Sequence, residues 1–97
     1  MSEVRISPSA SRYFKKLRDK KLKELFKKSV DEISENPYAG QLKKGDLSGI
    51  YGYDFYYQGT NYEIAYVIEK ADDGKIIVII LAGTRENFYE QLKKYWR

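Results

Sequence analysis

The longest hydrophobic run of the chain is Ile76 to Ala82, seven consecutive apolar residues that are rich in β-branched types. Such a run predicts a strand that is covered on both faces of its sheet. It is too short to cross a membrane and has no helical stripe. The run stops at Gly83, and the polar residues 84–87 lead into a final segment with helical spacing. We therefore expect a buried strand that ends beside a polar surface, with Gly83 allowing the backbone to turn.

Two apolar stripes with helical spacing precede the middle of the chain. Residues 3–7 alternate and predict a short first strand, after which Ser7 can cap a helix that begins at Pro8. The first stripe consists of Ala10, Tyr13, Phe14 and Leu17. The second stripe consists of Leu22, Leu25, Phe26, Val30 and Ile33. Residues 19–21 separate the stripes and Asn36-Pro37 ends the second, which predicts a helical hairpin with its lysines mostly outside.

In the middle of the chain the hydrophobic period changes to two, which predicts antiparallel strands. The aromatic positions that share one face are Tyr51, Tyr53, Phe55 and Tyr57. Residues 58–61 predict a turn, which would place Tyr56 opposite Glu63 and Asp54 opposite Ala65. The aromatic face would then cover the helices, and Asp54, Tyr56 and Glu63 would lie together on the other face.

The remaining segments complete the expected order of elements. Residues 38–48 are polar and predict a loop, and residues 71–74 predict the turn into the buried strand. Helical spacing returns after Arg85, with Thr84 as a possible cap. The order is a strand, a helical hairpin, a three-stranded antiparallel meander and a terminal helix. It predicts one α+β domain over residues 1–97, with the hairpin on one face of the sheet.

Composition narrows the chemistry that this chain can perform. It contains no cysteine and no histidine, so catalysis would use carboxylates, Lys, Arg or Tyr, and we expect neither a metal nor a cofactor. Up to residue 44 there are 12 Lys and Arg against 6 Asp and Glu, and afterwards 6 against 8. A basic half favours an anionic partner such as nucleic acid or an acidic peptide, although a solvated helix surface explains it equally well. Without a signal peptide or membrane span, a cytoplasmic location is expected.

Over nearly its full length the chain resembles the RelE/ParE family of bacterial type II toxins. The matching segments, in order, are Val4–Pro8, Asn36-Pro37, Leu47–Tyr51, Tyr62–Tyr66, Gly83–Arg85 and Phe88-Tyr89. The resemblance implies a RelE-like fold and a cognate antitoxin as partner. It also implies one of two activities. RelE-like members are metal-independent endoribonucleases that cut mRNA on the ribosome, whereas ParE-like members poison DNA gyrase without catalysis.

The resemblance also indicates site residues. Arg85 matches the family's arginine after the last strand, and Tyr89 matches its C-terminal tyrosine. The middle motif of the family usually has an arginine where this chain has Glu63. Basic residues that are common on the preceding strand are replaced by Asp54 and Tyr56. Arg85 is therefore expected to be the one positive charge left at the site.

For an RNA-cleaving toxin, the chemistry requires activation of a ribose 2′-hydroxyl, a cation for the phosphorane and a proton for the leaving oxygen. We expect Arg85 to clamp the phosphate, while Tyr89 and Glu63 share the proton transfers. The expected substrate-binding residues are Tyr56, which could stack on a base, Asp54 and Lys93.

Each candidate also has a structural interpretation. Arg85 could bind helix-end carbonyls or pair with Glu86, Glu63 could be a solvated strand residue, and Tyr89 could serve packing alone. The missing basic residues favour a ParE-like gyrase poison. A third alternative is an inactive relative that only binds an antitoxin.

Overall fold

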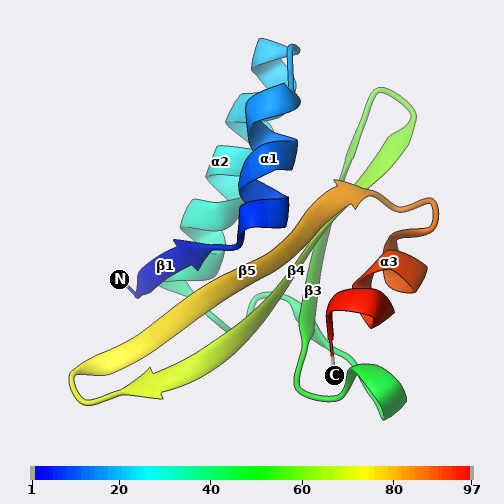
Figure 1. Ribbon diagram of the computed structural model, residues 1–97. Coiled ribbons are helices and arrows are strands. Elements are labelled where there is room, and N and C mark those ends of the chain that lie inside the picture. Colours follow the sequence, from blue (N-terminus) through cyan, green and yellow to red (C-terminus); the bar gives the residue numbers. More distant parts are fainter. Residues whose placement is uncertain (1, 97) are drawn as a thin grey trace.

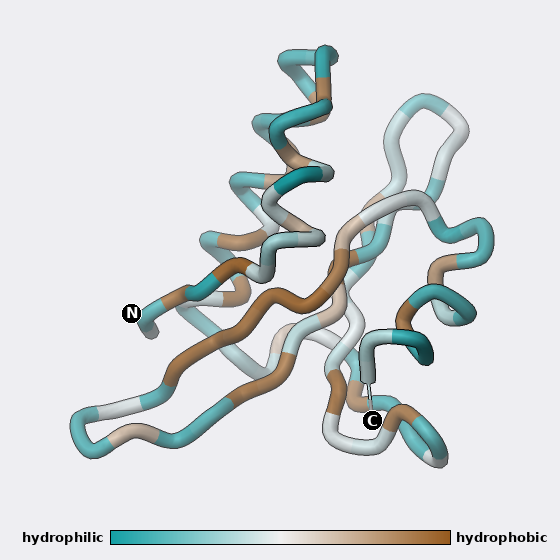
Figure 2. The backbone as a smooth tube through the Cα atoms, in the orientation of Figure 1, coloured by the Kyte–Doolittle hydropathy of each residue, from teal (hydrophilic) through white to brown (hydrophobic). Residues whose placement is uncertain are grey.

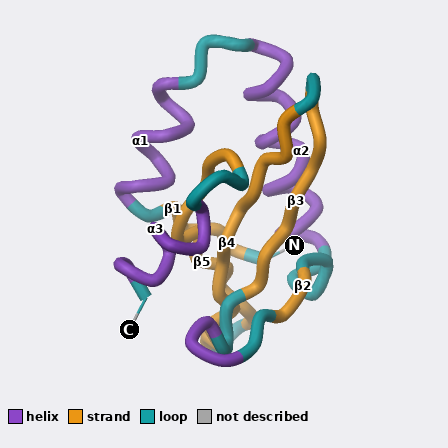
Figure 3. Tube along the Cα trace, turned by 90° about the vertical axis from the view of Figure 1, so that its right-hand side faces the viewer, coloured by secondary structure: helices purple, strands orange, loops and turns teal. Residues whose placement is uncertain are grey.

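The computed structural model describes residues 2–96 and has a five-stranded sheet with the order β1-β5-β4-β3-β2. Figure 1 shows the four longer strands, and Figure 3 labels the short β2. The strands are β1 (Glu3–Ile6), β2 (Gln41–Leu42), β3 (Tyr51–Tyr57), β4 (Thr60–Ala71) and β5 (Gly74–Thr84). The helices are α1 (Pro8–Lys16), α2 (Lys20–Glu35) and α3 (Phe88–Tyr95). β1 runs parallel to β5, and the other neighbouring strands are antiparallel. The predicted α+β order is confirmed.

The helices cover opposite faces of the sheet, as Figures 1 and 3 show together. α1 and α2 form a hairpin on one face, and the shorter α3 packs on the other. None of the helices within residues 2–96 is long and apolar enough to cross a membrane.

Side-chain caps set the boundaries of the helical hairpin. Ser7 caps α1, because its Oγ accepts a hydrogen bond from the Ala10 N–H at 3.1 Å, and it donates to the Ile80 carbonyl at 2.6 Å. Asp19 caps α2 and accepts from the backbone N–H of Leu22 at 3.2 Å. These caps satisfy N–H groups that the first helical turns leave free. The predicted start of the first helix at Pro8 is confirmed. The break between the helices lies at residues 17–19 rather than at the predicted residues 19–21, because the Asp19 cap starts α2 already at Lys20.

Phe26 is the centre of the core between the hairpin and the sheet, with only 2% of its surface exposed. The centre of its ring lies 4.9 Å from the ring centre of Phe55 in β3 and 5.3 Å from that of Phe14 in α1. Tyr62 of β4 contacts it at 5.7 Å, in the edge-to-face geometry that aromatic pairs prefer. The predicted aromatic face of β3 therefore does lie under the helices.

Two phenol groups of this aromatic face bond to acidic residues of the hairpin. Tyr57 donates to the Asp19 carboxylate at 3.0 Å, and Tyr53 donates to Glu32. Burial and the Glu32 bond raise the pKa of Tyr53 to about 12. The tyrosines thus add apolar area to the core and keep a polar end satisfied.

The hydrophobic run is the middle of β5 and is visible as a continuous brown stretch of that strand in Figure 2. It is covered on both faces as expected, since its residues belong to both core clusters. Ile77 and Ile79 join the core under the hairpin, whereas Leu81 packs with the residues around α3. A β-bulge makes this switch possible, because Tyr66 pairs with Ile79 but Ala65 pairs with Leu81.

The β3–β4 register differs from the predicted one. The turn is the two-residue pair Gln58-Gly59, whose φ angles of 48° and 77° are both left-handed. Such a turn matches the twist of the strands and is shorter than the expected one. Asp54 consequently faces Glu63, and Tyr56 faces Asn61, so the predicted pairs were wrong by two residues. A shift of two keeps every side chain on its expected face.

The segment expected to be a loop, residues 38–48, contains an edge strand. β2 pairs with the start of β3, and Lys43 extends this ladder by donating its N–H to the Ile50 carbonyl at 2.8 Å. A short 3₁₀ helix, Gly45–Leu47, follows. The polar composition concealed the strand because an edge strand of two residues buries almost no side chain.

The connection between β5 and α3 also differs from the predicted one. Gly83 lies within the strand and has no positive φ, so it does not provide the expected backbone turn. Thr84 is the last strand residue rather than a cap, and α3 begins only at Phe88, preceded by Asn87 with φ 60°. The strand outlasts its apolar run because pairing with β4 continues through Thr84.

The fold predicts a large cost for truncating the central aromatic side chain. Phe26→Ala should lower the free energy of unfolding by about 3–5 kcal/mol, since the cavity would lie among rings that cannot all collapse into it. Urea unfolding would measure this loss. Leu42→Ala is the control, because Leu42 is 52% exposed and should change stability by no more than about 0.5 kcal/mol. Equal losses for the two variants would contradict the described core.

Candidate functional site

The face of the sheet that α3 covers carries the predicted site residues in rows across the strands. Asp54 of β3 faces Glu63 of β4. One row nearer the β3–β4 turn, Tyr56 faces Asn61, whose carbonyl accepts the N–H of Arg85 at 2.9 Å. The paired strands thus bring residues that are distant in sequence onto one surface.

A buried hydrogen bond joins this surface to α3. The hydroxyl of Tyr89 donates to Oε2 of Glu63 at 2.5 Å, and Glu63 is only 4% exposed. Burial, followed by the bond to this carboxylate, raises the pKa of Tyr89 well above its ordinary value, and Arg85 partly opposes the rise. The interpretation of Glu63 as a solvated strand residue is therefore wrong, and Tyr89 does more than pack.

Arg85 lies exposed where β5 leaves the sheet. Asn61 orients it, since the amide orientation that satisfies both groups donates to the Phe55 carbonyl at 3.0 Å and accepts from Arg85 Nη1 at 3.0 Å. Within residues 2–96 the guanidinium forms no salt bridge, so the expected alternative of a pair with Glu86 is not observed. Its remaining donors are available to an anion.

Lys43 is a second cation at this site, which the sequence did not indicate. Its Nζ lies 5.0 Å from the centre of the Tyr89 ring. The expectation that Arg85 would be the one positive charge here was therefore wrong. Lys43 reaches the site from the unexpected edge strand, and the available signal was Gly52, since a glycine inside an aromatic strand often marks a close approach.

The remaining candidates lie at the rim. Tyr56 is 70% exposed on the same face as Arg85, a position open to a stacking ligand. Asp54 is exposed beside Glu63. Lys93 lies exposed on α3, one helical turn beyond Tyr89, and its side chain forms no hydrogen bond or salt bridge within the described part of the chain. The structure thus brings Glu63, Tyr89 and Arg85 together and leaves Lys93 at the periphery.

The arrangement can bind an anion and move a proton. It offers two cations and a carboxylate bonded to a phenol. Among residues 2–96, no group of three or more acidic side chains is arranged to hold a metal ion.

Residues 4–93 match the family model described as the ParE-like toxin of type II bacterial toxin-antitoxin systems. The chain is thus a toxin of the type II class and belongs to this ParE-like family. A comparison with curated protein sequences gave no match.

Three solved structures have a similar fold. The toxin-antitoxin complex RelBE2 from Mycobacterium tuberculosis is 25% identical, with a TM-score of 0.65 over 87% of this chain and 98% of that one. A mutant of the E. coli toxin RelE in the free state is 20% identical, with a TM-score of 0.69 over 96% of both chains. The intact E. coli RelBE complex is also 20% identical, with a TM-score of 0.67 over 86% of this chain and 95% of that one. The expected RelE-like fold is confirmed.

The buried pair predicts an effect on stability and on its pH dependence. Tyr89→Phe should destabilise the protein by about 1–3 kcal/mol at neutral pH, because the Glu63 carboxylate would lose its donor. The folded pKa of Tyr89 lies above the unfolded value near 10, so the bond stabilises the fold fully below pH 10 and progressively less above it.

Urea unfolding between pH 7 and pH 11 would measure both effects. The wild type should lose stability more steeply above pH 10 than Tyr89→Phe does. Tyr95→Phe is the matched control, because Tyr95 is exposed on the same helix and removing its hydroxyl should leave stability nearly unchanged. A Tyr89→Phe protein as stable as the wild type at pH 7 would contradict the described bond.

Proposed function

We propose that this toxin is a metal-independent endoribonuclease that cleaves mRNA on the ribosome. The observation that carries the proposal is the bond between the buried Glu63 carboxylate and the Tyr89 hydroxyl, with Arg85 beside it. A proton acceptor, a proton donor and a cation are the three groups that cleavage through a ribose 2′-hydroxyl requires.

In the proposed reaction, Glu63 accepts the proton of the ribose 2′-hydroxyl as its oxygen attacks the neighbouring phosphorus. The Arg85 guanidinium stabilises the charge on the phosphorane through two parallel hydrogen bonds. Tyr89 gives its proton to the departing 5′-oxygen, and the protonated Glu63 then returns a proton to the phenolate. The products are a 2′,3′-cyclic phosphate and a 5′-hydroxyl, and both side chains end in their starting states.

Tyr89 can act as the acid because a phenol with an ordinary pKa near 10 is protonated at neutral pH. Burial and the Glu63 bond raise the pKa of Tyr89 further and make the resting phenol a weaker acid, so proton transfer depends on the charge that develops on the leaving oxygen. The bond to Glu63 also couples the two proton transfers, because a change in charge on one partner directly affects the other. Tyr56, exposed on the same face, would stack on a base of the substrate.

A second candidate function follows from the carboxylates at the site. Asp54 and Glu63 occupy positions where the RelE resemblance leads us to expect basic residues. A site with fewer cations binds a nucleic acid backbone less strongly, which favours a toxin that poisons DNA gyrase by protein contacts. DNA breaks with intact mRNA during growth arrest would support this alternative.

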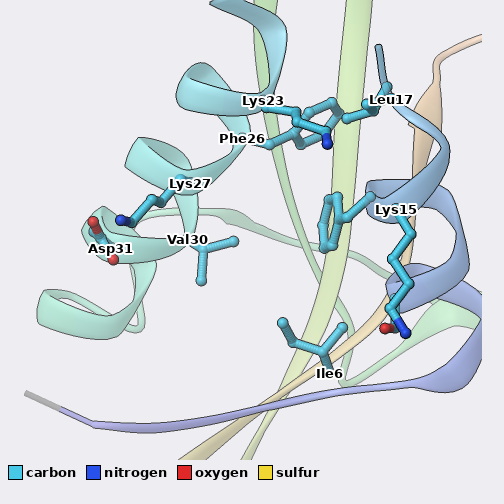
Figure 4. A pocket seen from close by; sticks show the side chains of 10 residues that line it. Ile6, Lys15, Leu17, Lys23, Phe26, Lys27, Val30 and Asp31 are labelled. Carbon is cyan, nitrogen blue, oxygen red and sulfur yellow. The ribbon is translucent and has the colours of Figure 1, made fainter. Parts of the chain in front are cut away.

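The proposed partner is an antitoxin that docks on the helical hairpin. A groove of about 430 Å³ lies between α1 and α2 and is lined mainly by apolar side chains. Figure 4 shows Ile6 and Val30 at this groove, with Lys15, Lys23 and Lys27 around it. An amphipathic segment with one apolar face and acidic residues along its flanks fits such a groove. The RelBE and RelBE2 structures are themselves toxin-antitoxin complexes.

The nuclease proposal predicts a severe effect of Arg85→Ala. The variant should lose about 2.7–4 kcal/mol of transition-state stabilisation, by analogy with removal of one oxyanion donor. Arg85→Lys should recover only part of the rate, because an ammonium lacks the planar fork of a guanidinium. The rate of mRNA cleavage in a translation extract would measure both losses.

Arg12→Ala is the control for Arg85→Ala, because Arg12 is an exposed arginine on α1. It should cleave at the wild-type rate, and melting curves should show that all variants fold, since an exposed arginine adds little stability. A folded Arg85→Ala protein that kills at wild-type potency would remove Arg85 from the mechanism and favour the gyrase alternative.

The antitoxin proposal predicts binding that weakens with salt. Charge reversal at Lys23 and Lys27 should lower the affinity for the cognate antitoxin at least tenfold at low ionic strength and less at high ionic strength. Isothermal titration calorimetry at two salt concentrations would measure this. Reversal of Lys70 and Lys94, which are exposed and lie outside the groove, is the matched control. If the wild type bound the antitoxin with equal affinity at both salt concentrations, the proposed electrostatic contribution to antitoxin binding would be contradicted.

A further inference from the structure

We propose that Lys43 is a substrate-binding residue that holds a second phosphate of the RNA strand, next to the phosphate that Arg85 binds. The inference rests on the proposed ribonuclease function and extends it, because it identifies how this site binds its substrate with so few basic residues. The structural basis is the placement of the Lys43 side chain over Gly52, beside Tyr89.

The backbone of Lys43 is held by the sheet. Its N–H donates to the Ile50 carbonyl at 2.8 Å, which continues the pairing of β2 with β3. The side chain is half-buried and lies over β3 on the face that carries Glu63. A lysine anchored in this way has a narrower choice of positions for its ammonium group than one in a mobile loop.

Gly52 creates the space that this side chain occupies. A Cβ atom at Gly52 would lie 2.7 Å from Cε of Lys43, 3.3 Å from its Nζ and 3.4 Å from the Tyr89 hydroxyl. Any larger residue would therefore displace the end of the lysine. Because this Cβ position is close to both groups, the Lys43 ammonium and the Tyr89 hydroxyl lie near each other.

The ammonium is not neutralised by the carboxylates nearby. Within residues 2–96, the Lys43 side chain forms neither a salt bridge nor a hydrogen bond, and its contact at the site is with the face of the Tyr89 ring. A cation–π contact of this kind holds the charge in place without removing its hydrogen-bond donors. The group can therefore still bind a phosphate.

The two cations lie on either side of the reacting pair. Asp54 and Glu63 form the middle row of paired residues on this face. Lys43 lies over Gly52 in the row on one side, and Arg85 pairs with Asn61 in the row on the other side. At the usual strand rise, the two outer rows are about 13 Å apart, and both side chains can reach inward. An RNA strand with its scissile phosphate at Arg85 would present a neighbouring phosphate to Lys43.

The test separates binding from chemistry in cleavage of a defined mRNA on purified ribosomes, with the toxin in excess over a range of concentrations. Lys43→Met keeps the aliphatic chain over Gly52 and removes only the charge. It should raise the half-saturating toxin concentration on the order of tenfold, while the maximal rate stays within about twofold of the wild type. The slope of the logarithm of the half-saturating concentration against the logarithm of the salt concentration should fall by about one, because one phosphate contact is lost.

Further variants test whether the weaker binding results from loss of the Lys43 charge at this position. Gly52→Ala should reproduce the effect of Lys43→Met, because the added methyl group displaces the lysine, which is flexible enough for the fold to persist. Lys43→Arg should restore binding, and Lys44→Ala, which removes an exposed neighbouring charge, should behave as the wild type does. Arg85→Ala should instead lower the maximal rate.

The two proposals fail in different ways. A wild-type half-saturating concentration and salt dependence for Lys43→Met, in a protein that cleaves mRNA, would overturn the role of Lys43 alone. A loss of maximal rate without a change in half-saturation would also overturn it. Absence of cleavage by the wild type would overturn the ribonuclease proposal and, with it, this inference.

Discussion

The site depends on one hydrogen bond between the end of the chain and the middle of the sheet. Glu63 lies in the centre of the meander and is almost fully buried, so its carboxylate needs a donor within the protein. Tyr89 supplies that donor from α3. The bond therefore fixes the short terminal helix against the sheet, and it places a proton acceptor and a proton donor in contact. The same two side chains thus hold α3 on the sheet and form the acid–base pair of the proposed reaction.

The two-sided burial of β5 gives this bond a rigid support. The bulge opposite Tyr66 lets the strand contribute isoleucines to the core under the hairpin and Leu81 to the core under α3. Arg85 directly follows this strand, so its backbone is positioned by the ladder and its guanidinium by Asn61. The exposed groups of the site thus rest on a strand that is packed on both faces, which limits the motion of the Arg85 guanidinium relative to Glu63 and Tyr89.

Much of the fold could be predicted from local patterns, because each pattern reflects burial of one face. The helical stripes, the cap at Ser7 and the aromatic alternation of β3 all have this origin, and the structure confirms them. Pairing between strands was harder, since the β3–β4 register depends on the left-handed turn rather than on polarity. The placement of Lys43 beside Tyr89 could not be predicted, because it depends on an edge strand with no burial pattern. The burial of Glu63 was not predicted either, because the helix that contacts it, α3, lies far away in the sequence.

In the proposed function, a buried carboxylate–phenol pair and two flanking cations cleave RNA without a metal. The most direct test is the chemistry of mRNA ends after expression of the toxin without its antitoxin. A ribonuclease of this kind should produce new fragments within coding regions that carry a 2′,3′-cyclic phosphate and a 5′-hydroxyl, and Glu63→Gln should abolish them. Growth arrest with intact ribosome-bound mRNA, or fragments with 5′-phosphate ends, would contradict it.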